Sequence, residues 1–138
     1  YKSVYLPSLH SYGLSSLTFA IDTSGSVTSE ELRTMLSEIR GIQNTFHPKH
    51  MKIIDCDAEI HNVYDINYTT DILSLDFSGG GGTSFEPVME YVKENPTQAL
   101  IYFTDLHANV PIDPKIPVLW ICTSDAKEMP FGKTVYFN

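Results

Sequence analysis

Hydrophobic residues along the chain gather in short runs that alternate with longer stretches of helical pattern. The run 118–122 contains only apolar residues, and 99–105 is apolar over most of its length, which is typical of strands covered on both faces of a sheet. The pattern therefore predicts an α/β fold, a doubly wound and mostly parallel sheet with helices between its strands. Six runs have the length and composition of strands: 17–22, 51–55, 59–65, 99–105, 118–122 and 134–137.

Two segments carry apolar residues at helical spacing. In 29–45 the apolar positions recur every three or four residues, and Thr28 with Glu31 has the form of a capping box at the start. The second predicted helix, 84–94, follows four glycines, accepts Pro87 in its first turn and ends before the next proline.

The second and third strand-like runs are joined by only three residues, 56–58. A parallel pair needs a crossover of about a dozen residues or more, so these two strands must form an antiparallel hairpin. We expect residues 51–66 to be an edge hairpin that provides no metal ligand, despite Asp55, Asp57 and His61. Asp57 lies in the turn, where Asp is favoured because it makes local hydrogen bonds.

Polar residues follow directly where two of the apolar runs end. Asp22 opens the sequence Asp-Thr-Ser-Gly-Ser (22–26) behind the first run, and Asp105 ends the fourth run. In open parallel sheets ligands bind at the carboxyl ends of the strands, near the point where the strand order reverses. If these two strands are neighbours, both carboxylates converge at one edge with Thr83, which follows the glycines 79–82.

These loops offer two carboxylates and three hydroxyls. Oxygen ligands without Cys or His suit a hard divalent cation, such as Mg²⁺ or Mn²⁺, rather than zinc. Because three of the donors are neutral, the cation stays electron-poor and keeps at least one position open for an acidic oxygen from a protein partner. The predicted metal ligands are Asp22, Ser24, Ser26, Thr83 and Asp105.

Composition limits the function classes. The chain has 138 residues, 42% of them apolar, which is enough for one folded domain. Its net charge of −8 and its lack of a Lys/Arg cluster exclude a general nucleic-acid binder. No apolar run approaches the ~20 residues of a membrane span, and no signal peptide opens the chain. We interpret Cys56 and Cys122 as buried thiols in a reducing compartment, hence cytoplasmic, and the start at Tyr1 favours a domain cut from a longer protein.

Enzyme motifs are missing from the sequence, and we expect no enzyme. An aspartic protease needs two Asp-Thr-Gly motifs, and a P-loop needs a lysine where the glycines here run into Thr83. Two alternatives remain: a Mg²⁺-dependent hydrolase that uses the same site, and a structural domain whose site is empty. His47 and His50 lack a third zinc ligand, and His107 is expected at the rim of the site without a ligand role.

At these residues the chain resembles the von Willebrand factor A (VWA) domains. Their metal-ion-dependent adhesion site uses an Asp-x-Ser-x-Ser loop, a distant Thr and a distant Asp in that order, and the resemblance spans about residues 17–137. It is closest to the VWA-like domain of bacterial and phage proteins, in which the domain follows a predicted metallopeptidase-type region. The segments that carry this closer resemblance are 22–26, 56–58, 80–87 and 130–132.

The resemblance implies a VWA-like domain at 17–138 behind an irregular lead-in of residues 1–16. It implies a metal-dependent binding role, in which Ser24, Ser26 and Thr83 contact the metal directly while the two aspartates often act through water. VWA-like proteins often work with AAA-type ATPases, which makes such an ATPase a candidate partner. The chain is shorter than the adhesive members of the family, so their allosteric switching is not expected here.

Overall fold

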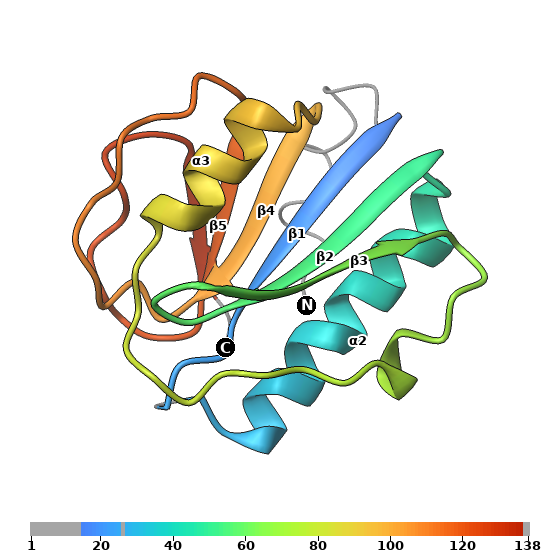
Figure 1. Cartoon of the computed structure of the whole chain (residues 1–138), viewed down its shortest axis with the longest axis horizontal. Coiled ribbons are helices and arrows are strands. Elements are labelled where there is room, and N and C mark those ends of the chain that lie inside the picture. The colour runs from blue at the N-terminus through green and yellow to red at the C-terminus, as the bar shows by residue number, and fades with distance from the viewer. Residues whose placement is uncertain (1–14, 26, 137–138) are drawn as a thin grey trace.

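The computed structural model describes residues 15–25 and 27–136, which form one six-stranded sheet (Figure 1). Its strand order is β3-β2-β1-β4-β5-β6, and every neighbouring pair is parallel except β2 with β3. The predicted fold class, a mostly parallel sheet with an antiparallel edge hairpin, is confirmed. The strands are β1 (Ser16–Asp22), β2 (His50–Cys56), β3 (Ile60–Ile66), β4 (Ala99–Thr104), β5 (Val118–Cys122) and β6 (Lys133–Tyr136).

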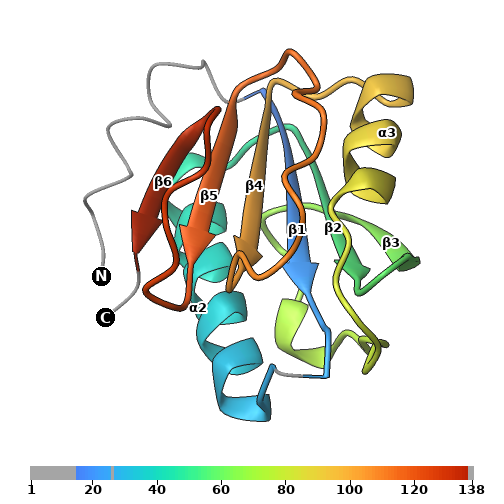
Figure 2. The same ribbon diagram turned by 90° about the vertical axis from the view of Figure 1, so that its left-hand side faces the viewer.

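Helices α2 (Ser29–Phe46) and α3 (Glu86–Glu94) cover opposite faces of this sheet (Figures 1 and 2). Successive strand residues point to opposite faces, so Phe19 packs in the core under α2 while Ala20 packs in the core under α3. Trp120 is fully buried and belongs to the α3 core. Both faces of the central strands are therefore shielded from water, which explains why these strands are predominantly apolar in sequence.

The strand order reverses between β1 and β4. From β1 the chain crosses to β2 on one side, forms the hairpin, and returns through α3 to place β4 on the other side of β1. Ile21 of β1 lies beside Phe103 of β4, so the carboxyl ends of the two strands are adjacent. The neighbouring arrangement on which the predicted site depends is present, and it falls at the point where such sheets bind ligands.

The element boundaries differ from the predicted ones by a few residues. Helix α2 begins where predicted, because the Thr28 hydroxyl accepts the Glu31 N–H (3.0 Å) and the Glu31 carboxylate accepts the Thr28 N–H (2.9 Å). Helix α3 begins two residues later than predicted, because its first helical hydrogen bond runs from the Met89 N–H to the carbonyl of Phe85, the N-cap residue (3.1 Å).

A short 3₁₀ turn, Ile72–Ser74, was not predicted, and it leads from β3 toward the glycines. None of the helices among the described residues is long and apolar enough to cross a membrane. The predicted lead-in falls mostly on residues 1–14, and the predicted end of the last strand falls on residue 137. Both lie outside the described residues.

Candidate metal site

Asp22, the last residue of β1, is a fully buried carboxylate. Its Oδ1 accepts the backbone N–H of Ser24 (2.8 Å), and its Oδ2 accepts the hydroxyl of Thr104 (2.8 Å) from the end of β4. Both donors are neutral. The salt bridges among the described residues join Arg40 to Asp71 and His61 to Asp57, so neither of them reaches Asp22. A buried charge is costly unless it is paired or coordinates a metal, and the position of Asp22 therefore suits a bound cation.

The loop after β1 packs directly against the glycine loop, which we define as residues 79–82. The N–H of Gly25 donates to the carbonyl of Gly81 (2.9 Å), and the N–H of Gly80 donates to the carbonyl of Thr23 (2.8 Å). A Cβ atom at position 79 would lie only 2.2 Å from the Thr23 carbonyl oxygen. Glycine is therefore required at position 79 for the two loops to approach this closely.

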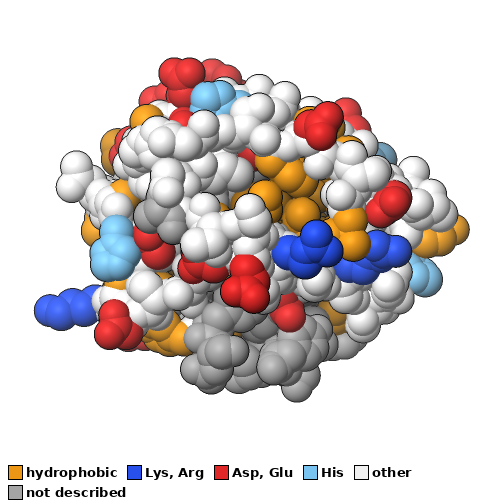
Figure 3. Space-filling view, turned by 90° about the horizontal axis from the view of Figure 1, so that it is seen from below, with side chains coloured by type: hydrophobic (Ala, Val, Ile, Leu, Met, Phe, Trp, Pro, Cys, Tyr) orange, Lys and Arg blue, Asp and Glu red, His pale blue; other side chains and the backbone are white. Residues whose placement is uncertain are grey.

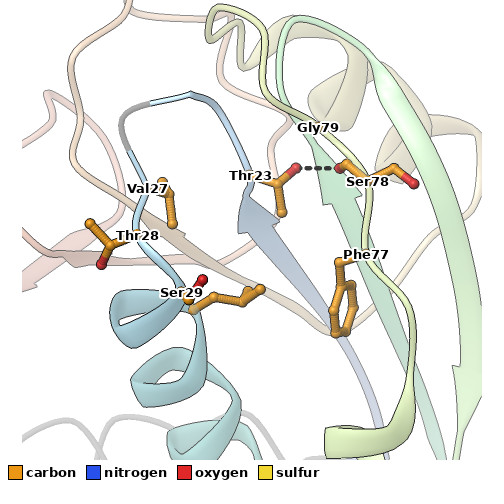
Figure 4. A pocket seen from close by; sticks show the side chains of 8 residues that line it. Thr23, Val27, Thr28, Ser29, Phe77, Ser78 and Gly79 are labelled. Carbon is orange, nitrogen blue, oxygen red and sulfur yellow. Dashed lines mark hydrogen bonds between the residues drawn. The ribbon is translucent and has the colours of Figure 1, made fainter.

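The Thr23 side chain reinforces this contact. Its hydroxyl lies 2.6 Å from the carbonyl oxygen of Ser78 and 3.1 Å from that of Cys56 (Figure 4). The side chain of Thr23 thus points toward the glycine loop. The next residue, Ser24, is only 5% exposed, and its backbone N–H bonds Asp22.

Two carboxylates of the β2–β3 hairpin hold the glycine loop from its other side. Oδ2 of Asp55 accepts the N–H of Ser78 (2.6 Å), and Oδ2 of Asp57 accepts the N–H of Gly81 (3.0 Å). With the bond from the Ser84 N–H to the Asp57 carbonyl, the hairpin fixes the backbone on both sides of Thr83, which is half-buried.

The hydrogen bonds to Asp57 also set its charge. Desolvation alone would raise the pKa of this carboxyl, but the Glu59 N–H, the His61 side chain and the Gly81 N–H together lower the pKa to about 2. Asp57 is therefore ionised at neutral pH, and its negative charge is balanced by donors from the hairpin and the glycine loop.

Asp105 follows β4 directly and is half-buried. Its Oδ1 accepts the N–H of His107 (2.9 Å), and its carbonyl accepts the hydroxyl of Ser124 (2.7 Å). Leu106, the next residue, has a φ of 66° although it is not glycine, and its N–H donates to the Thr104 hydroxyl (3.1 Å). This left-handed conformation is uncommon for a leucine, and such residues cluster at functional sites. His107 lies at this rim as an exposed side chain.

Four of the five predicted ligands thus belong to segments that meet at this edge, through hydrogen bonds or at adjacent strand ends. Asp22 bonds the backbone of Ser24 and, through Thr104, lies beside Asp105, while the contact of residues 23–25 with the glycine loop brings Thr83 to the same edge. Ser26, the fifth, lies outside the described residues. In the described part of the chain no three His, Cys, Asp or Glu side chains gather to hold a metal.

Three further residues hold the loops of the candidate site, and the sequence pattern did not predict their contacts. Thr23 directly follows Asp22, and Thr104 directly precedes Asp105. This adjacency to a predicted ligand is the local signal by which both threonines could be found. For Asp57 the sequence predicts only local hydrogen bonds in the hairpin turn. Its contact with Gly81 joins segments 24 residues apart, and nothing local in the sequence indicates it.

A hollow of about 180 Å³ lies beside the glycine loop, between it and the start of α2 (Figure 4). Thr23, Val27, Leu32 and Phe77 are among the residues that line it. Seen from below, this end of the molecule shows hydrophobic side chains within a hollow, with Lys and Arg side chains beside it (Figure 3).

Residues 17–138 match the family described as VWA-like domain (DUF2201). A protein from Thermotoga maritima, described as uncharacterized, is 27% identical over 109 residues, which cover 78% of this chain and 27% of that protein. The chain thus spans about a quarter of the length of this relative.

A solved structure also shares the fold. The crystal structure of an aerotolerance-related membrane protein from Bacteroides fragilis, carrying multiple mutations to serines, superposes with a TM-score of 0.61. The alignment covers 84% of this chain and 72% of that one at 13% sequence identity, which supports similarity of fold alone.

Proposed function

Because the chain belongs to the family of VWA-like domains, we propose that it is a protein-binding module that works through one Mg²⁺ or Mn²⁺ ion. The observation that carries this proposal is the buried Asp22 carboxylate, held by two neutral donors where the strand order reverses. A cation at this edge would supply the missing positive charge. The hydroxyls and carboxylates that lie there are the ligands that Mg²⁺ and Mn²⁺ prefer.

In this proposal Ser24, Ser26 and Thr83 contact the metal directly, and Asp22 and Asp105 act mostly through water. Two contacts support this assignment: the Ser24 N–H donates to Asp22, and the carbonyl of Gly81, two residues before Thr83, accepts the Gly25 N–H. Because the three direct ligands are neutral, they do not neutralise the cation. An acidic side chain of a partner protein therefore completes the coordination.

A titration with Mn²⁺ tests the metal site, using the matched pair Thr83→Ala and Thr83→Ser. We expect one Mn²⁺ ion to bind the wild type, Thr83→Ser to retain binding because it keeps the hydroxyl, and Thr83→Ala to weaken it at least tenfold. Asp22→Ala is expected to abolish binding. Equal affinity in the wild type, Thr83→Ala and Asp22→Ala would show that the ligands are misassigned.

The partner requires a second test. By the resemblance, a candidate is an AAA-type ATPase in the cytoplasm, and the domain belongs with a metallopeptidase-type region in a longer protein. Binding of that ATPase to the full-length protein should be lost with EDTA and with Asp105→Ala, and should survive His107→Ala. A complex that survives EDTA would contradict the metal-dependent binding mechanism but not the fold assignment.

We propose no catalytic activity for the domain. Phosphoester hydrolysis that depends on Mg²⁺ and disappears in Asp22→Ala would instead support the hydrolase alternative.

A further inference from the structure

Asp57 makes two sets of hydrogen bonds that point in different directions. Toward its own hairpin, its Oδ1 accepts the Glu59 N–H (3.1 Å) and lies 2.8 Å from Nε2 of His61. Toward the glycine loop, its Oδ2 accepts the Gly81 N–H (3.0 Å) and its carbonyl accepts the Ser84 N–H (3.1 Å). With 6% of its surface exposed, Asp57 is enclosed between the two segments.

The contacts toward the glycine loop lie on both sides of Thr83. Gly81 comes two residues before it and Ser84 comes directly after it. A backbone that is held at both of these positions has little freedom to move the residue between them. The backbone on both sides of Thr83 is therefore held by a residue on a different element.

We infer that Asp57 is a positioning residue for the metal site and acts on the metal through Thr83. This inference rests on the proposed function and extends it to a residue that provides no ligand. A turn of this kind needs only the bond from Oδ1 to the Glu59 N–H. The second carboxylate oxygen, which faces Gly81, is not needed for the turn. Residues that orient metal ligands in this way typically change metal affinity by about 10- to 100-fold when they are mutated.

The glycine loop offers a matched pair of substitutions that separates this role from general stability. A Cβ atom at Gly81 would lie 2.9 Å from Oδ2 of Asp57, whereas a Cβ atom at Gly82 meets no atom within 4 Å. Neither glycine has a positive φ. Gly81→Ala thus displaces the Asp57 carboxylate, and Gly82→Ala does not.

The experiment measures Mn²⁺ affinity and the thermal midpoint of the metal-free protein for the wild type, Gly81→Ala, Gly82→Ala, Asp57→Ser and the double variant Gly81→Ala with Asp57→Ser. Serine keeps a short oxygen for the turn but cannot reach Gly81. We expect Asp57→Ser and Gly81→Ala each to weaken Mn²⁺ binding by about tenfold or more, and Gly82→Ala to bind within about twofold of the wild type. The double variant should bind no more weakly than Asp57→Ser, because both changes remove the same contact.

Amide hydrogen exchange of the metal-free proteins provides the second readout. The N–H groups of Gly81 and Ser84 should exchange faster in Asp57→Ser, with no general loss of protection in the strands. Wild-type affinity in Asp57→Ser and Gly81→Ala would overturn the inference while the proposed function stands. Equal weakening by Gly81→Ala and Gly82→Ala, or additive losses in the double variant, would overturn it as well. Lack of Mn²⁺ binding by the wild type would instead overturn the proposed function itself.

Discussion

At the scale of single residues, the functional edge of the sheet is built around three buried aspartates. Asp22 and Asp55 are fully buried and Asp57 is 6% exposed, yet each of them accepts at least two hydrogen bonds. Their roles differ. Asp55 and Asp57 use their oxygens to hold loops, whereas Asp22 lies where the two central strands end. Three carboxylates at one end of a protein with a net charge of −8 make a local field that attracts cations.

The lowered pKa of Asp57 predicts a defined pH dependence of stability. Its pKa falls from the ordinary 3.8 to about 2 on folding, so the folded state favours the ionised form. The stabilising contribution is therefore complete above 3.8 and disappears as the pH falls toward 2. Urea unfolding at pH values from 5 to 2 should show the difference in free energy of unfolding between wild type and Asp57→Asn shrinking over this range. A difference that stays constant down to pH 2 would contradict it.

At the scale of elements, the site depends on where helices and loops begin. Helix α2 starts only a few residues after the candidate ligands of the first loop, and its capping box fixes the direction in which the chain enters the helix. The β2–β3 hairpin lies at the edge of the sheet and provides no predicted ligand. Its turn nevertheless holds the glycine loop, because Asp57 accepts the Gly81 N–H. The loops are thus positioned by neighbouring elements as well as by their own glycines.

Replacing the cap of α2 tests the first of these dependences. Thr28→Ala removes the acceptor of the Glu31 N–H and should lower the free energy of unfolding by about 1 kcal/mol. Thr28→Ser keeps an equivalent hydroxyl and should cost less than half of that. Chemical denaturation with both variants provides the measurement, and equal losses would show that the hydroxyl does not cap the helix.

The contrast between local and distant signals explains what could be predicted from the sequence. Apolar runs such as 118–122 and the capping box at Thr28 are local patterns, and the elements they predict are present. The bond from the Ser84 N–H to the Asp57 carbonyl could not be predicted, because it joins residues 27 positions apart in the sequence. The ligand residues could be proposed from strand ends, but the residues that hold them in place depend on tertiary contacts.

At the scale of the whole molecule, the apolar cores lie on the two faces of the sheet, and the candidate ligands lie at one end of it. Two apolar cores, one on each face, stabilise the sheet without contributing to its ligand edge. All the candidate ligands among the described residues lie at the carboxyl ends of β1 and β4 or on the loop beside them. This division lets the edge carry buried charges that would destabilise a smaller core.

Metal binding should therefore appear as added global stability. A ligand that binds only the folded state at 100 times its Kd stabilises by about 2.7 kcal/mol. The thermal midpoint should rise with Mn²⁺, return with EDTA, and remain unchanged in Asp22→Ala. An equal rise in that variant would place the ion elsewhere on this acidic protein.

The hydrogen bond between Asp22 and Thr104 spans 82 positions of the chain, and this separation governs when the site can form. During synthesis the β2–β3 hairpin can close as soon as β3 has emerged, because closing the short turn between the two strands costs little entropy. The pairing of β1 with β4 must wait until most of the domain has left the ribosome, and such distant contacts form slowly. A truncated or still nascent chain therefore carries the Asp-Thr-Ser-Gly-Ser sequence without a working site. In the proposed function, metal and partner binding therefore require the chain up to the end of β4.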